Sequence, residues 1–219
     1  MLVACAARLT SAVVLAALTV TGMGATGCAP ATVSLSADAE PPGTSFTKTR
    51  DRWSRSGRII STRDMETSLL VSATMRSRAY QHAYSDRYTK LYRISDPAER
   101  ARIEAAALAD ASSVTFWVRS ATYAPRWNDL RPEVGKWRLA LLDDEGHEVV
   151  AEKVELVSTA EQPRQLELLD ESRDPYGKLW LVRFPAMLGD QPVPRPTARK
   201  IILRVTGPLG QTDLTWALY

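Results

Sequence analysis

Cysteine is almost absent from this chain, and its two positions limit the chemistry that is open to the protein. Cys5 and Cys28 both lie within the first 28 of 219 residues, so no cysteine follows. This inventory excludes a disulfide, a cysteine nucleophile and a cysteine-ligated zinc or redox site after residue 28. We therefore expect a hydrophobic core that is large enough to hold the fold without cross-links.

Histidine is equally scarce, since His82 and His147 are the only two in the sequence. They fall in different predicted elements, have no partner motif, and are both expected to be exposed. The chain also lacks a Gly-x-Ser-x-Gly elbow, a His-Glu-x-x-His pair and a glycine-rich phosphate loop. The sequence thus predicts no catalytic residue, metal ligand or cofactor, and we expect the protein not to be an enzyme. A hydrolase that uses two carboxylates needs only two placed acids, so it remains an alternative.

The N-terminal apolar run is too short to cross a bilayer. It extends from Ser11 to Val20, which is about the length of the apolar region of a secretory signal and well below the roughly 20 residues of a spanning helix. Arg8 precedes the run, and a segment of small residues from Thr21 to Gly27 follows it and leads directly to Cys28. This order of charge, apolar run and small residues indicates an export signal.

The four residues Ala25-Thr26-Gly27-Cys28 resemble the lipobox of bacterial lipoproteins, although Ala25 stands where that family usually has leucine. The resemblance covers only the first 28 residues. It implies that residues 1–27 are a signal peptide and that Cys28 is acylated, so that a lipid anchors the protein to a membrane. Because Ala29 and not aspartate follows, it also implies sorting to the outer membrane of the cell envelope, facing the periplasm. Ordinary signal cleavage and an uncleaved anchor are the alternatives.

The charge of the chain is nearly balanced, with 28 basic and 25 acidic residues and a formal net charge of +3. Loss of Arg8 with the signal would leave a net charge of about +2, which excludes nucleic acid as a partner on charge alone. Six cations nevertheless lie close together: Lys48, Arg50, Arg52, Arg55, Arg58 and Arg63. We predict a solvated, partly disordered linker there; attraction to anionic lipid headgroups is the alternative.

Residues 28–45 are small, polar and rich in proline, so they predict a flexible linker between the acylated cysteine and the folded domain. We assign residues 46–219 to one domain. Its first predicted strand lies within Glu66–Met75, where apolar residues alternate with polar ones. Further strands with the same alternation follow from Ser113 onward. They are expected at Val114–Val118, Trp137–Leu141, Val149–Val157, Leu166–Leu168, Leu179–Phe184, Ile201–Val205 and Leu214–Leu218.

Two helices are predicted between the first and second of these strands, at about residues 77–111. The first carries tyrosines at every fourth position, and the second begins at Asp96, a good N-cap residue, followed by Pro97. The acidic run Asp143-Asp144-Glu145 before Gly146 predicts a hairpin tip, because a calcium loop places its ligands at alternating positions. Together these elements predict a mainly β fold, an antiparallel immunoglobulin-like β-sandwich with a two-helix insertion.

The tyrosine row is the candidate binding surface. Tyr80, Tyr84, Tyr88 and Tyr92 share one helix face. Such a row is typical of a helix that packs on a sheet; an exposed stripe that stacks on sugars or docks a partner is the alternative. Trp127 is added to this surface because it lies in a predicted irregular segment beside Arg126. Trp53 is interpreted in the same way, whereas the tryptophans at 117, 137, 180 and 216 are expected in the core.

These observations predict a membrane-anchored envelope lipoprotein that acts as a non-catalytic binding or assembly module. Its expected partners are the membrane, through the lipid, and another envelope protein or a glycan. A glycan-binding or cell-wall-binding module is the first alternative, and a carboxylate-based hydrolase is the second.

Overall fold

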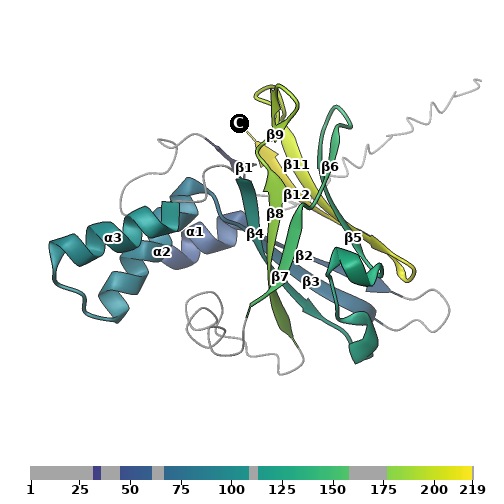
Figure 1. Cartoon of the computed structure of the whole chain (residues 1–219), viewed down its shortest axis with the longest axis horizontal. Coiled ribbons are helices and arrows are strands. Elements are labelled where there is room, and N and C mark those ends of the chain that lie inside the picture. Colours follow the sequence, from purple (N-terminus) through teal and green to yellow (C-terminus); the bar gives the residue numbers. More distant parts are fainter. Residues whose placement is uncertain (1–31, 36–44, 61–66, 109–112, 158–176, 219) are drawn as a thin grey trace, which may run out of the picture.

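The computed structural model describes residues 32–35, 45–60, 67–108, 113–157 and 177–218. The predicted signal peptide, Cys28 and the predicted strand at Leu166–Leu168 lie outside these residues. The described chain is mainly β, as predicted, with antiparallel sheets and three α-helices (Figure 1).

The strands form two five-stranded sheets. The first sheet has the order β1 (Thr32–Val33), β12 (Gly210–Leu218), β11 (Lys200–Gly207), β5 (Arg138–Asp143), β6 (Glu148–Val150). The second has the order β2 (Ser54–Ile60), β3 (Thr67–Met75), β4 (Ser113–Ala121), β8 (Lys178–Pro185), β7 (Lys153–Leu156). Neighbouring strands are antiparallel, except that β1 runs parallel to β12. A separate ribbon pairs β9 (Met187–Leu188) with β10 (Gln191–Pro192).

Apolar side chains from both sheets form one core. The alternation predicted around Glu66–Met75 is confirmed, because the side chains of Leu69, Val71, Ala73 and Met75 are all buried. Burying this face stabilises β3 by the hydrophobic effect, about 1.5–3 kcal/mol for each large aliphatic side chain. Among the tryptophans, those at 137, 180 and 216 are buried as predicted. Trp117 is half-buried on the outer face of β4, where the Arg76 guanidinium lies 5.0 Å from its ring centroid.

The two sheets approach each other closely where β2 lies beside β12. Trp216 donates a hydrogen bond from Nε1 to the carbonyl oxygen of Trp53 at 2.9 Å, and Arg55 Nε donates to the carbonyl oxygen of Thr215 at 2.9 Å. Gly57 makes the approach possible, since a Cβ at this position would lie 2.5 Å from Thr212 Oγ1. The interpretation of Trp53 as an exposed anchor is wrong, because its ring is in the core.

The chain changes sheets between β6 and β7. The backbone amide of Ala151 donates to Leu139 in the first sheet, and the next amide, of Glu152, donates to Arg183 in the second. The single strand predicted over Val149–Val157 is therefore two short strands. The sequence carries a sign of this break, because buried Val149 and Ala151 stand at odd positions and buried Val154 at an even one, with exposed Glu152 and Lys153 between them.

Three helices lie beside the sheets: α1 (Phe46–Trp53), α2 (Arg78–Leu91) and α3 (Pro97–Leu108). The last two connect β3 to β4, where the insertion was predicted. Ser77 caps α2 by accepting a hydrogen bond from the amide of Tyr80 at 3.1 Å, and Asp96 accepts one from the amide of Ala98 at 3.1 Å. We call α2 and α3 together the arm, which projects away from the two sheets (Figure 1).

The basic stretch is folded over most of its length. Lys48, Arg50 and Arg52 belong to α1, and Arg55 and Arg58 to β2, so the prediction of a disordered linker is wrong for these residues. Buried Phe46, Thr49 and Trp53 recur at helical spacing between the cations and pack α1 against the core. Arg63 lies outside the described residues.

A short strand also lies within the range predicted as a flexible linker. Thr32 and Val33 form β1 and pair with Ala217 and Leu218 of β12. Val33 is completely buried. Only two residues are involved, which is too few for alternation to reveal in the sequence.

None of the helices in the described part of the chain has the length and apolar character needed to cross a bilayer.

Candidate functional site

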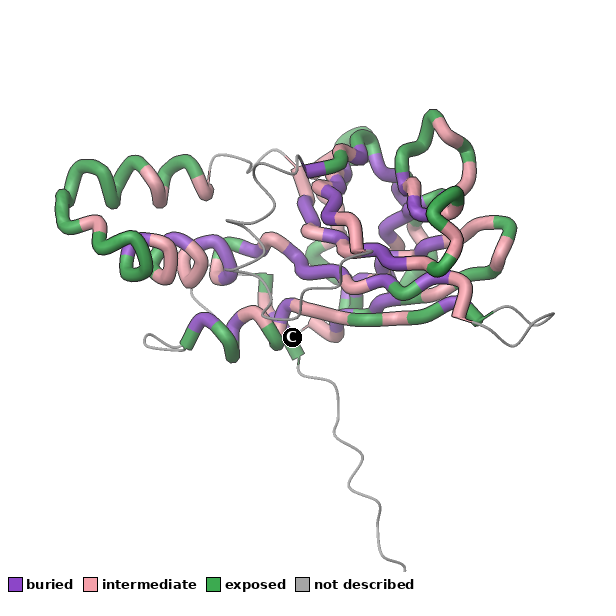
Figure 2. The backbone as a smooth tube through the Cα atoms, turned by 90° about the horizontal axis from the view of Figure 1, so that it is seen from below, coloured by how far each residue is buried: buried purple, intermediate pink, exposed green. Residues whose placement is uncertain are grey.

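The tyrosine row on α2 changes from core to surface along its length. Tyr80 is completely buried, Tyr84 and Tyr88 are half-buried, and Tyr92, at the C-cap of the helix, is 45% exposed. The structure therefore combines the two interpretations of the row: its first ring packs in the core and its last ring is at the surface. Figure 2 shows how the burial decreases from the sheets towards the end of the arm.

Each ring of the row contacts the next. The ring centroids are 6.2 Å apart for Tyr80 and Tyr84, 6.4 Å for Tyr84 and Tyr88, and 4.4 Å for Tyr88 and Tyr92. At the buried end, the ring of Phe46 in α1 lies 6.0 Å from that of Tyr80. The rings thus form a continuous aromatic path from the core to the end of the arm, and tilted pairs of this kind add stability beyond their burial.

The phenol groups of the buried end stay protonated. Burial raises the pKa of Tyr80 far above its ordinary value and raises that of Tyr84 to about 12, with a further contribution from neighbouring Tyr88. The buried half of the row therefore carries no negative charge.

Leu91 extends the exposed end of the row. This side chain is 53% exposed and precedes Tyr92 in the chain. We call Tyr88, Leu91 and Tyr92 the arm tip. Sequence reasoning missed Leu91 because a leucine in a helix usually packs in the core, and the end of α2 at this residue leaves its side chain exposed.

The second helix of the arm, α3, buries little of its surface against the rest of the protein. No residue of α3 is buried, and the apolar residues Ile103, Ala107 and Leu108 are only half-buried. A polar contact joins the two helices, with His82 Nδ1 2.6 Å from Glu104 Oε1. His82 is thus partly exposed, as predicted, but it has a partner on the neighbouring helix.

Trp127 lies far from the tyrosine row. It ends the short helix η1 (Pro125–Trp127), which follows the last residue of β4, whereas the arm precedes the first residue of this strand. The nine residues of β4 separate the two positions by about 26 Å. Trp127 packs partly against the core, and its carbonyl oxygen accepts a hydrogen bond from Trp137 Nε1 at 2.7 Å. The predicted binding surface is therefore not one surface.

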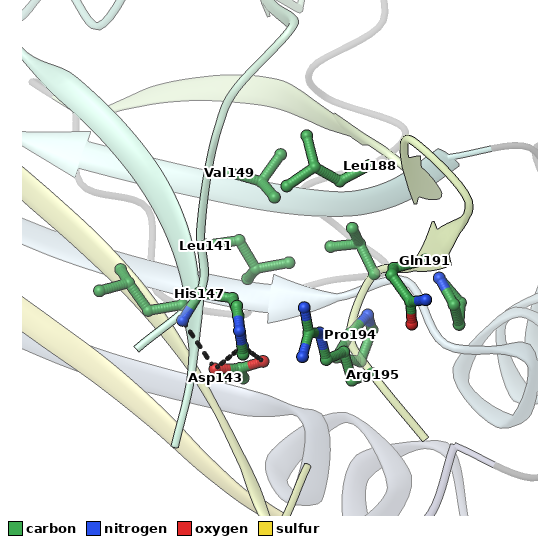
Figure 3. Close-up of a pocket in the computed structure, with 11 residues that line it drawn as sticks. Leu141, Asp143, His147, Val149, Leu188, Gln191, Pro194 and Arg195 are labelled. Atoms are coloured by element: carbon green, nitrogen blue, oxygen red, sulfur yellow. Dashed lines mark hydrogen bonds and ion pairs between the residues drawn. The ribbon is translucent and has the colours of Figure 1, made fainter. Parts of the chain in front are cut away.

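A second cluster lies at the β5–β6 hairpin, where the predicted acidic turn is found. Asp143 accepts hydrogen bonds from the amides of Glu145 at 3.0 Å and His147 at 2.9 Å, and His147 Nδ1 lies 2.9 Å from its Oδ2 (Figure 3). Burial alone would raise the pKa of Asp143, but the hydrogen bonds and charge of His147 and the amide of Glu145 together hold this pKa below its ordinary value. The carboxylate therefore stays charged and fixes the turn.

The cavity beside this pair is small and mostly apolar. It has a volume of about 50 Å³, enough for one or two water molecules and far below the size of a metabolite site. Its lining is apolar apart from Asp143, His147, Gln191 and Arg195. No serine, threonine or cysteine is among the lining residues, so the Asp–His pair has no nucleophile beside it in this cavity.

The other acids of the turn have partners on the segment before β11. Asp144 accepts a hydrogen bond from the amide of Arg199 at 2.9 Å, and Glu145 accepts one from Thr197 Oγ1 at 3.2 Å. Glu145 Oε2 also lies 3.7 Å from His147 Nδ1, so this ring contacts both Asp143 and Glu145. Among the described residues, no three histidine, cysteine, aspartate or glutamate side chains are grouped so that they could hold a metal ion.

Comparison with known proteins adds little. No family model and no curated protein matches this chain. A solved structure of a novel protein of unknown function from Burkholderia pseudomallei K96243 is 12% identical, with a TM-score of 0.39 over 77% of this chain and 79% of the other. A similarity this low identifies neither a shared fold nor a shared function.

Proposed function

We propose that this protein is a bacterial envelope lipoprotein, acylated at Cys28, and that it is a non-catalytic module that docks an envelope protein through the arm tip. The observation that carries the docking proposal is the aromatic path of α2, which begins in the core at Tyr80 and ends in exposed Leu91 and Tyr92. The anchor rests on the lipobox-like residues before Cys28, and the location proposed is the outer membrane, facing the periplasm.

A protein partner fits the arm tip better than a sugar does. A sugar stacks on the open face of an aromatic ring, but the Tyr88 and Tyr92 rings lie against each other with centroids 4.4 Å apart. The arm tip instead combines apolar surface with the hydroxyl groups of its two tyrosines. Tyrosine is enriched at protein–protein interfaces. Glycan binding is therefore the second candidate, supported by the exposed ring of Tyr92.

A carboxylate-based hydrolase has less support. The acids of the β5–β6 turn have structural partners: Asp143 and Glu145 both contact His147 within the turn, and Asp144 and Glu145 contact the segment before β11. We also keep the immunoglobulin-like sandwich as a proposal. The repeated passage of the chain between the two sheets after β4 supports it, while the consecutive order of β2, β3 and β4 in one sheet is a difference from that fold.

Capture from native membranes tests the docking proposal. The acylated full-length protein is crosslinked in its own cells and purified, and the proteins that accompany it are identified by mass spectrometry. We expect one enriched envelope protein, which is lost in a Leu91→Ser, Tyr92→Ser double variant. Tyr123→Ser is the matched control, because this tyrosine is 85% exposed and lies away from the arm, after β4.

Two further outcomes separate the candidates. Equal capture by the double variant and the control would contradict docking through the arm tip. Retention on isolated cell wall, lost only in the double variant, would favour the glycan candidate. A Cys28→Ala variant tests the anchor separately, and we expect it to leave the membrane fraction.

A further inference from the structure

The chain between the proposed lipid attachment and the folded domain is short. Cys28 is four residues before Thr32, which is the first residue of β1 and pairs with Ala217. The next residue, Val33, is completely buried and fixes the strand in place. Since an extended chain spans at most about 3.6 Å per residue, Cys28 lies within about 14 Å of Thr32. The domain is therefore held against the bilayer, and the end of the first sheet near β1 is close to the lipid.

The β9–β10 ribbon lies at the same end of the molecule. Across the first sheet, Thr32 pairs with Ala217, which pairs with Lys200, and the neighbouring Ile201 pairs with Asp143 at the end of β5. Three strand spacings of about 4.8 Å separate β1 from β5, or about 14 Å. Leu188 of the ribbon lines the small cavity beside Asp143. Figure 1 shows β1, β9 and the C-terminus at this end.

The ribbon presents an exposed apolar pair. Met187 and Leu188 are adjacent in β9 and are 51% and 52% exposed. Arg199, just before β11, and Lys200, the first residue of this strand, are exposed at the same end of the sheet. An apolar pair beside cations is the residue combination that enters the boundary between headgroups and acyl chains.

Most acidic side chains at this end form hydrogen bonds or ion pairs within the protein. The Asp144 carboxylate accepts a hydrogen bond from the amide of Arg199, and Glu145 Oε2 lies 3.4 Å from the guanidinium of Arg195. Asp190, in the turn between β9 and β10, is exposed. Formal charges at this end nearly cancel, so contact with a bilayer would depend on the apolar pair more than on the charge of the lipids.

We propose that the acylated protein lies with this end on the bilayer and that Met187 and Leu188 enter the headgroup–acyl boundary as a second anchor beside the lipid. The inference rests on the proposed acylation of Cys28. Acylation alone would attach the protein to the membrane, whereas insertion of Met187 and Leu188 would also fix which end of the domain faces the bilayer.

Depth-dependent fluorescence quenching tests the inference. A mature chain acylated at Cys28 has no free thiol, so Met187→Cys creates a single site for a fluorescent label. The acylated full-length product is purified from membranes and reconstituted in vesicles of phosphatidylethanolamine and phosphatidylglycerol that carry nitroxide-labelled acyl chains. We expect the label at residue 187 to be quenched several-fold more than a label introduced by Gln211→Cys. Gln211 is exposed at the far end of β12, about 20 Å from Ala217 along the strand.

The mass of the purified protein separates the two possible failures. If Cys28 carries its lipid and both labels are quenched equally weakly, the second anchor is contradicted and the proposed lipoprotein stands. An unmodified Cys28 in the membrane-purified protein would contradict the proposed anchor, and this inference with it. Leu188→Cys repeats the measurement at the neighbouring side chain, and the same ordering against residue 211 is expected.

Discussion

At the scale of single residues, the Asp143 carboxylate is the best-connected polar group in the β5–β6 turn. It accepts hydrogen bonds from two backbone amides and contacts the His147 ring. Gly146 completes the turn with a φ of 87°, which a residue with a side chain rarely adopts. Asp143 and His147 resemble part of a catalytic site, but the hydrogen bonds that hold the turn explain why they lie together.

Replacing this carboxylate is expected to weaken the fold in a pH-dependent way. We expect Asp143→Asn to lower the free energy of unfolding by about 1–3 kcal/mol at pH 7, since hydrogen bonds to a charged acceptor are lost. The folded-state pKa of Asp143 is lowered, so its stabilising effect is present above the unfolded pKa of about 3.9 and is lost as the pH falls through the lower folded value. Urea unfolding of wild type and variant should therefore differ at pH 7 and converge in acid. Asp190→Asn, at an exposed position, is the control, and an equal loss there would contradict the role of Asp143.

Tyr80 has a hydroxyl group that is buried without a hydrogen-bond partner among the described residues. A buried polar group without a partner costs about 1–3 kcal/mol. We expect Tyr80→Phe to keep the ring contacts with Phe46 and Tyr84 and to raise the free energy of unfolding by about 1 kcal/mol. Chemical denaturation measures the change. A loss of stability instead would show that the hydroxyl group contributes an interaction in the folded protein.

At the scale of elements, the sequence predicted those segments whose apolar pattern is long and regular. The strand at Glu66–Met75, α2 and the last two strands were predicted, because a buried face leaves a period of two or four in the sequence. The helix α3 has no buried residue and was predicted from its start at Asp96 and Pro97. α1 was missed because its three buried residues stand among three cations, and β1 was missed because two residues carry no period.

The candidate site was predicted only in part. The tyrosine period gave the correct helix face, but the gradient from buried Tyr80 to exposed Tyr92 depends on how far the arm projects from the sheets. Trp127 was added because it lies in an irregular segment beside Arg126, and its distance from the arm depends on the direction of β4, which sequence does not show. The contact of Asp143 with His147 was missed because the turn geometry creates it.

The helix α3 is also expected to be the least stable helical element. No residue of α3 is buried, so its opening exposes little apolar surface and costs little free energy. We expect the amide protons of α3 to exchange with solvent much faster than those of β11, whose alternate residues are buried in the core. Hydrogen exchange followed by mass spectrometry measures both elements in one experiment. Equally slow exchange in α3 and β11 would contradict this account of the arm, whereas added partner should slow exchange at the arm tip.

At the scale of the whole molecule, the proposal gives two functions to two different parts: the lipid attaches the protein to the membrane, and the arm tip binds the partner protein. If Cys28 is acylated as proposed, the short chain after it would hold the domain at the membrane, and the arm carries Leu91 and Tyr92 away from the two sheets (Figure 1). Restriction to a surface raises the effective concentration of a module for partners on the same membrane, so a small patch such as the arm tip can act without high intrinsic affinity.

Photo-crosslinking from the arm tip in living cells tests the central proposal most directly. Tyr92→p-benzoylphenylalanine places a photoreactive ring at the exposed end of the row, and Tyr123→p-benzoylphenylalanine places the same group on an exposed loop elsewhere. Under illumination, we predict one discrete crosslinked envelope protein from position 92 and none from position 123. The same diffuse crosslinks from both positions, or none from either, would contradict a docking role for the arm.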